Sequence, residues 1–99
     1  MNNELFLKDE YLEMLRKIFQ QYCPSAEILA YGSRIKGNAH SGSDLDLAIK
    51  SLEGSESSII ELREIIRESN VPFFVDIFEF NALPQSFQEE INRKNIRIF

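Results

Sequence analysis

The sequence has little that would tie it to secretion, to a membrane or to direct binding of nucleic acid. It contains one cysteine, Cys23, which cannot form a disulfide within the chain and predicts a reducing compartment, the cytoplasm. No apolar run approaches the roughly 20 residues of a membrane span. The acidic start lacks the basic and apolar regions of a signal peptide. The formal net charge of -5 argues against strong nucleic-acid binding, which needs clustered positive charge.

The chain has 99 residues, of which 43% are hydrophobic, and this predicts one domain, residues 1–99, with a modest core. No repeat or low-complexity linker divides it. Apolar residues at helical spacing predict helices over residues 8–22, 57–70 and 86–94. Short apolar runs predict strands over 27–31, 45–49, 73–80 and 96–99, the last at an edge of the sheet. Because the run over 73–80 is apolar on both faces, it is typical of a central strand.

One stretch between two predicted strands, GSRIKGNAHSGSDLDL, carries most of the chemistry. Gly32 permits a positive φ and close approach of a ligand, and Ser33 can open a helical turn whose free N–H groups suit a phosphate. At the other end, Asp44 and Asp46 share one face of a strand, because side chains alternate along it. Two such carboxylates repel each other and are typical ligands of a hard divalent cation. On that short pattern alone, a solvated acidic face is an equal alternative.

A third aspartate, Asp76, lies in the middle of the apolar run over 73–80. An isolated carboxylate there would be unfavourable without partners. We therefore expect Asp76 to lie beside the strand of Asp44 and Asp46 and to share their cation. The alternative is an acid near the end of the strand that reaches solvent. Glu79, on the opposite face from Asp76, is interpreted as a charge at the rim.

The loop between the turn and the aspartates offers further polar groups whose roles stay open. Arg34 and Lys36 either contact phosphate or belong to a solvated turn. His40, the only histidine, is more typical of a solvated side chain than of a ligand or base.

These residues together resemble the DNA polymerase β-like nucleotidyltransferase superfamily, and in particular its minimal (MNT-type) members. The resemblance rests on Gly32-Ser33, the ten residues that follow, the Asp44-Leu-Asp46 motif and the later strand aspartate, and it covers nearly the whole chain. It implies an α/β (α+β) fold: a small mixed β-sheet with helices packed mainly on one side.

The same resemblance assigns roles to individual residues. Asp44, Asp46 and Asp76 would be the catalytic residues and would bind metal, two Mg²⁺ ions in this family. It also implies four nucleotide-binding residues, which are Gly32, Ser33, Arg34 and Ser43. The implied reaction transfers a nucleoside monophosphate, by family habit AMP from ATP, to a hydroxyl group. MNT-type proteins are similar to antitoxins that modify a tyrosine of a HEPN-domain toxin, so a HEPN partner is implied.

Two kinds of protein fit these features. The first is a Mg²⁺-dependent nucleotidyltransferase that acts on a protein partner. The second is a non-catalytic antitoxin or nucleotide-binding module that neutralises its partner by contact. Three acids that converge on one place favour the first. Because the chain ends after the catalytic domain, we expect the acceptor surface to come from a partner or from a second copy in a homo-oligomer.

Overall fold

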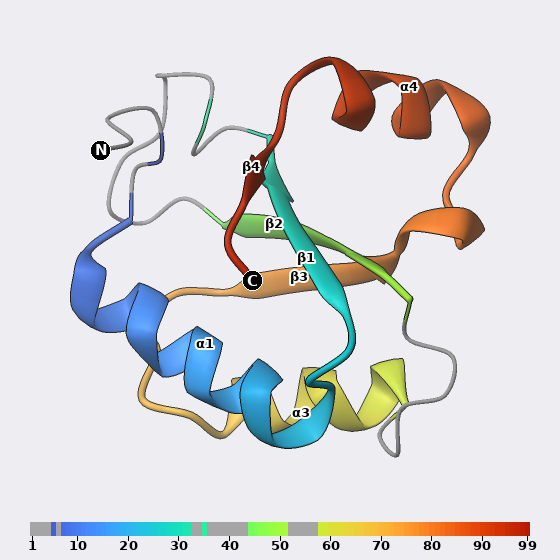
Figure 1. Cartoon of the computed structure of the whole chain (residues 1–99). Helices are drawn as coiled ribbons and strands as arrows, with labels where there is room; N and C mark the ends of the chain where they lie inside the picture. The colour runs from blue at the N-terminus through green and yellow to red at the C-terminus, as the bar shows by residue number, and fades with distance from the viewer. Residues whose placement is uncertain (1–4, 6, 33–34, 36–43, 52–57) are drawn as a thin grey trace.

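A four-stranded mixed β-sheet forms the centre of the computed structural model, which describes residues 5, 7–32, 35, 44–51 and 58–99 (Figure 1). The strands are β1 (Glu27–Tyr31), β2 (Leu45–Lys50), β3 (Val75–Glu79) and β4 (Ile96–Arg97), in the order β3-β2-β1-β4. Strand β1 pairs antiparallel with β2 and β4, whereas β2 pairs parallel with β3.

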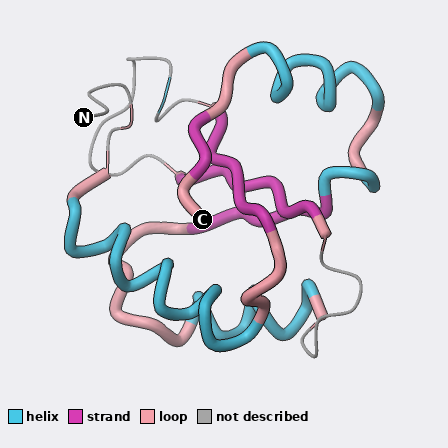
Figure 2. The backbone as a smooth tube through the Cα atoms, in the orientation of Figure 1, coloured by secondary structure: helices cyan, strands magenta, loops and turns pink. Residues whose placement is uncertain are grey.

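Helices lie on both faces of this sheet, although most of the helical cover is on one of them (Figure 2). On that face are α1 (Asp9–Tyr22) and α3 (Ile59–Arg67). The 3₁₀ helix η1 (Phe80–Ala82) and helix α4 (Gln85–Arg93) lie on the opposite side (Figure 1). The expected α+β fold, with a mixed sheet and helices mainly on one side, is confirmed.

The larger core joins α1 and α3 to the sheet. Leu15 and Phe19, four residues apart on α1, have no exposed surface, and Leu62 and Ile66 of α3 occupy the equivalent positions on that helix. This spacing places each pair on one helix face, which is why the apolar residues were recognisable in the sequence. Burial of each such side chain contributes roughly 1.5–3 kcal/mol to stability.

The ends of the two helices follow local chemistry. Helix α1 stops at Cys23, because the residue before Pro24 disfavours the helical conformation. Helix α3 begins after Ser58, whose hydroxyl accepts a hydrogen bond from the Glu61 backbone N–H while the Glu61 side chain accepts one from the Ser58 N–H. The helix ends at Arg67, earlier than the expected 57–70.

Strand β2 separates its two faces cleanly. Leu45, Leu47 and Ile49 are buried in the larger core, beneath α1 and α3. On the other face, Ala48 is buried in a smaller cluster with residues of β1, η1 and α4: Leu29, Phe80 and Ile91. Asp46 lies on this second face and is half-buried. The smaller cluster therefore covers only part of that face.

The expected central position of the apolar run over 73–80 is wrong, because β3 is the edge strand of the described sheet and spans only Val75–Glu79. Its apolar residues are accounted for separately. Phe80 belongs to η1 and is buried in the smaller cluster, Phe78 is partly covered by the Arg63 guanidinium, and Phe74 is 53% exposed. A segment that is apolar on both faces therefore does not require a neighbouring strand on each side.

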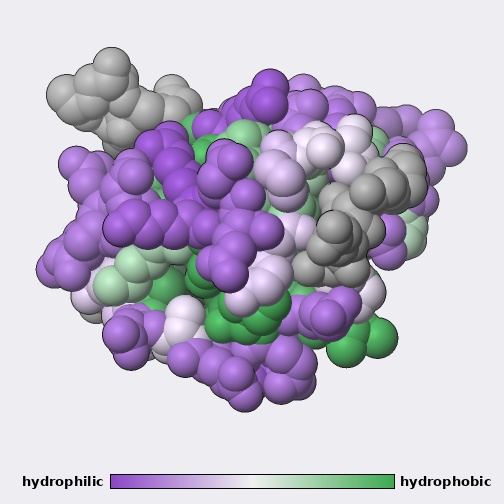
Figure 3. All heavy atoms as spheres, turned by 60° about the horizontal axis from the view of Figure 1, so that its bottom comes forward, coloured by the Kyte–Doolittle hydropathy of each residue, from purple (hydrophilic) through white to green (hydrophobic). Residues whose placement is uncertain are grey.

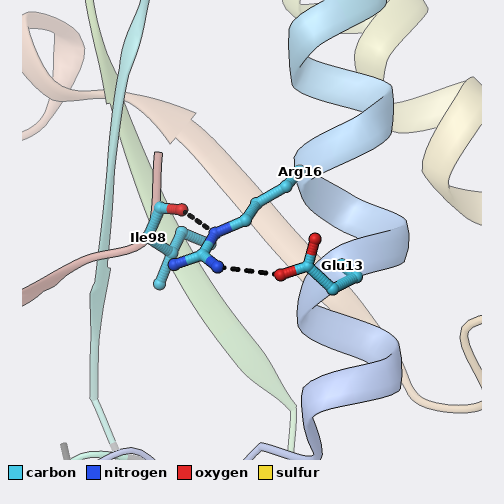
Figure 4. Close-up of polar contacts among 3 residues, drawn as sticks. All are labelled: Glu13, Arg16 and Ile98. Atoms are coloured by element: carbon cyan, nitrogen blue, oxygen red, sulfur yellow. Dashed lines mark hydrogen bonds and ion pairs between the residues drawn. The ribbon is translucent and has the colours of Figure 1, made fainter. Parts of the chain in front are cut away.

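The C-terminal segment is fixed against both the sheet and α1. Ile98 donates its N–H to the Ile28 carbonyl, and the Phe99 carbonyl accepts from the Ile28 N–H. Arg16 of α1 donates through Nε to the Ile98 carbonyl at 2.8 Å and through one terminal nitrogen to Glu13 at 2.9 Å (Figure 4). The segment thus extends the expected edge strand along β1. None of the helices in the described ranges is long and apolar enough to span a bilayer.

Candidate active site

Three polar side chains form a row across the sheet. Tyr31 at the end of β1 is the register partner of Asp46 in β2, and Asp46 is in turn the register partner of Asp76 in β3. Cross-strand partners project from the same face of a sheet. This face is the one that α1 and α3 do not cover, since the neighbours of Asp46 along β2 are buried beneath those helices. The expectation that Asp76 lies beside the strand of Asp46 is confirmed.

Gly32 follows Tyr31 directly and lies against the Asp46 side chain. Its φ is 87°, a conformation that favours glycine. A Cβ at this position would collide with Oδ2 of Asp46 and lie 3.3 Å from its Cγ. Gly32 is thus required both by the backbone conformation and by the space that the carboxylate occupies. The Gly32 turn and the Asp46 carboxylate are therefore packed against each other in one site.

Asp44 precedes β2 and is exposed, whereas Asp46 and Asp76 are both half-buried. Burial raises the pKa of the Asp46 carboxyl, and the negative charges of Asp76 and, to a smaller extent, Asp44 raise it further. The charges of the other two aspartates therefore both act on the Asp46 carboxyl. Bringing a cation to this place would relieve the repulsion.

The carboxylates suit a hard divalent cation, although the set of metal ligands is incomplete among the described residues. Carboxylate oxygens are the ligands that Mg²⁺ prefers, and Asp46 and Asp76 lie side by side on neighbouring strands. Across the residues that the structure describes, however, no group of three or more His, Cys, Asp or Glu side chains is gathered tightly enough to hold a metal ion. The arrangement shows an adjacent pair, with Asp44 exposed at the start of the strand. The assignment of metal to all three aspartates stays a prediction.

Tyr31 is a member of the site that the sequence reasoning assigned only to a strand. Burial raises the pKa of its phenol to about 12, with further contributions from the negative charges of Asp46 and Asp76. The hydroxyl is consequently neutral near pH 7 and lies next to two carboxylates. The sequence offered one sign of this role, because Tyr31 immediately precedes Gly32 and the last residue of β1 must adjoin the turn.

Several predicted residues fall outside the described part of the chain. These are Ser33, Arg34 and Ser43 of the nucleotide-binding set, together with Lys36 and His40. Of that set, the structure places Gly32 beside Asp46.

A pair of carboxylates beside a glycine turn, on a small mixed sheet, is the arrangement expected of a nucleotidyltransferase of the polymerase β type. The family model for polymerase β nucleotidyltransferases matches residues 13–99, and the chain belongs to this family. It is also similar to the probable protein adenylyltransferase MntA of Haemophilus influenzae. The two are 37% identical over 91 residues, which cover 91% of this chain and 80% of the relative. The chain is therefore a nucleotidyltransferase of the MNT type.

Proposed function

We propose that this nucleotidyltransferase transfers AMP from ATP to a hydroxyl group of a partner protein. The observation that supports this most directly is the pairing of Asp46 with Asp76, with Gly32 packed against the Asp46 carboxylate. The name of the Haemophilus relative, a probable protein adenylyltransferase, supports AMP as the transferred group and a protein as the acceptor.

In this proposal the residues divide the work along the sheet. The backbone at Gly32 would face the triphosphate, and Asp44, Asp46 and Asp76 would hold Mg²⁺ ions. Mg²⁺ bound there would neutralise phosphate charge and lower the pKa of the attacking hydroxyl. The acceptor oxygen forms a bond to the α-phosphorus of ATP, the bond to pyrophosphate breaks, and the Asp76 carboxylate accepts the hydroxyl proton. Tyr31, whose hydroxyl is neutral near pH 7, provides a hydrogen-bond donor beside the carboxylates.

We further propose that the acceptor is a tyrosine of a HEPN-type toxin and that the modification makes this chain an antitoxin in the cytoplasm. This part of the proposal is supported by the MNT-type family to which the chain belongs and by the name of the Haemophilus relative, a probable protein adenylyltransferase. The lone cysteine, Cys23, is buried and free, which supports a reducing compartment.

The test is an intact-mass comparison. This chain is co-expressed with the protein encoded beside it, and the masses of both are measured for the wild type, for Asp46→Asn and for Glu79→Gln. The last variant removes the exposed carboxylate at the far end of β3, three residues beyond Asp76, without touching the paired aspartates. We expect the partner to gain whole AMP units with the wild type and with Glu79→Gln, and the transfer to fall by about 100-fold or more with Asp46→Asn.

Removal of divalent metal with EDTA should abolish the added mass, and Mg²⁺ should restore it. A partner that stays unmodified with the wild type but co-purifies with every variant would instead identify a contact-only antitoxin. Equal transfer by the wild type and Asp46→Asn would refute the assignment of the site.

A further inference from the structure

The order of the strands gives the site a direction. The Gly32 turn follows β1, Asp46 lies on β2 and Asp76 lies on β3, which has no further strand beside it among the described residues. If the triphosphate lies at the Gly32 side, as the proposed function requires, the acceptor must approach from the Asp76 side. The surface beyond β3 is therefore where an acceptor would be recognised.

A hollow lies at this place, between the C-terminal half of α3 and the start of β3. Two arginines of α3, Arg63 and Arg67, line it together with Phe73, Phe74 and Asp76. Phe74 is among the large apolar side chains most exposed in the described structure, at 53%. Figure 3 shows apolar patches among hydrophilic side chains on the side of the molecule where α1 and α3 lie. The hollow thus combines positive charge with apolar surface.

Arg63 is held at the edge of the sheet. Its Nε donates to the Ile77 carbonyl at 3.0 Å, and its guanidinium lies 5.4 Å from the centre of the Phe78 ring. The Ile77 carbonyl is therefore already occupied, which disfavours addition of another strand to β3. Recognition at this edge must then depend on side chains and charge.

Arg67 is available to an outside partner. Its contact with Glu64, at 3.2 Å, joins two side chains that are 63% and 58% exposed. Exposed pairs of this kind contribute little to stability, so the guanidinium can exchange one carboxylate for another. Two arginines line this hollow against one carboxylate, Asp76, although the chain as a whole carries a net charge of -5.

We propose that this hollow docks an acidic segment of the acceptor protein and so brings an adjacent hydroxyl residue to Asp76. Arg63 and Arg67 bind carboxylates that flank the acceptor residue, and Phe74 covers its apolar part. The inference rests on the proposed transfer to a protein hydroxyl and adds to it the chemistry of the acceptor. It assigns Arg67 and Phe74 a role in selecting the acceptor, with no role in binding ATP.

The experiment uses two labelled peptides, each with a central tyrosine, flanked on both sides by glutamates in one and by lysines in the other. Binding to the full chain is measured by fluorescence anisotropy without ATP, and AMP transfer is measured separately by mass spectrometry with ATP and Mg²⁺. The variant Arg67→Glu is compared with Arg93→Glu, which reverses an arginine with a similar i,i+3 partner and similar exposure on α4. In the same way, Phe74→Ala is compared with Phe87→Ala, whose ring is 52% exposed on α4.

We expect the wild type to bind the glutamate peptide in preference to the lysine peptide. Arg67→Glu should weaken this binding by about tenfold, since an attraction becomes a repulsion, while Arg93→Glu leaves it unchanged. Phe74→Ala should weaken it as well, and Phe87→Ala should not. The KM for ATP should stay the same in all four variants.

Equal binding of the two peptides, or equal loss in Arg67→Glu and Arg93→Glu, would overturn the inference. A changed KM for ATP in Arg67→Glu with peptide binding intact would do so too, because the hollow would then belong to the nucleotide. Peptide binding that depends on Arg67 without any AMP transfer would leave the docking surface standing and count against the proposed function.

Discussion

Substitution of Gly32 by alanine should damage the site in two separable ways. Alanine at a φ of 87° is strained by about 1–2 kcal/mol. The added methyl group would also occupy the place of the Asp46 Oδ2 atom, so the carboxylate must leave its rotamer, at about 0.5–1.5 kcal/mol. We expect Gly32→Ala to lower the free energy of unfolding by about 1.5–3.5 kcal/mol, the sum of these two terms.

The effect on catalysis should exceed the effect on folding. A displacement of about 1 Å in a reacting group can lower a rate by about 100-fold, and the methyl group displaces Asp46 itself. Transfer of AMP, measured by the added mass of the partner, should therefore fall by about that factor at temperatures where the variant is fully folded.

A double-mutant cycle separates the strain from the collision. In an Asp46→Ala background the Oδ2 atom is absent, so Gly32→Ala should lose only the backbone part, about 1–2 kcal/mol. Chemical denaturation of the four proteins gives the coupling energy directly. An identical loss in both backgrounds would refute the claim that Gly32 is needed for the space beside Asp46.

Three further outcomes follow from the charges and burial. Asp46→Asn should be more stable than the wild type at pH 7, because burial and the charges of Asp76 and Asp44 raise the pKa of Asp46 on folding. The difference should shrink as the pH falls through that pKa, and Mg²⁺ should shrink it at pH 7, as thermal unfolding would show. Folding raises the pKa of Tyr31 from about 10 to about 12, so the folded state holds the proton more tightly and stability should fall as the pH rises from 10 to 12, an effect that Tyr31→Phe removes in denaturation at alkaline pH. Cys23 is fully buried and burial raises its thiol pKa, so iodoacetamide should react with it only after unfolding, and rapid labelling of the native protein would contradict its place in the core.

The sequence predicted best those features that local patterns determine. The strand over 27–31 is observed at those residues, and a helix is observed within the range predicted over 57–70. The proximity of Asp46 and Asp76 was also predictable, because a half-buried carboxylate in an apolar strand needs either solvent or a shared partner. This contact between residues far apart in the chain was predicted from the cost of burying a carboxylate, and the periodicity of the sequence did not indicate it.

What the sequence did not reveal depended on tertiary cover. The position of β3 at the edge could not be inferred, because Phe78 is covered by Arg63 from α3 and Phe80 by the smaller cluster, neither of which is a neighbouring strand. The role of Tyr31 was missed for a related reason. A tyrosine at the end of an apolar run is interpreted as a core residue from the sequence, and only the strand register shows that it lies opposite Asp46.

The division of one sheet face explains how so short a chain can hold both a core and a site. Ala48 and Asp46 are two residues apart on the same face of β2, yet Ala48 is fully buried beneath η1 and α4 while Asp46 is not. The small side chain of Ala48 allows Phe80 and Ile91 to close over that part of the face. Among the described residues, the smaller cluster does not extend over Asp46 and Asp76, which stay half-buried. The stability lost there is offset on the opposite face, where Leu45, Leu47 and Ile49 of the same strand are buried beneath α1 and α3.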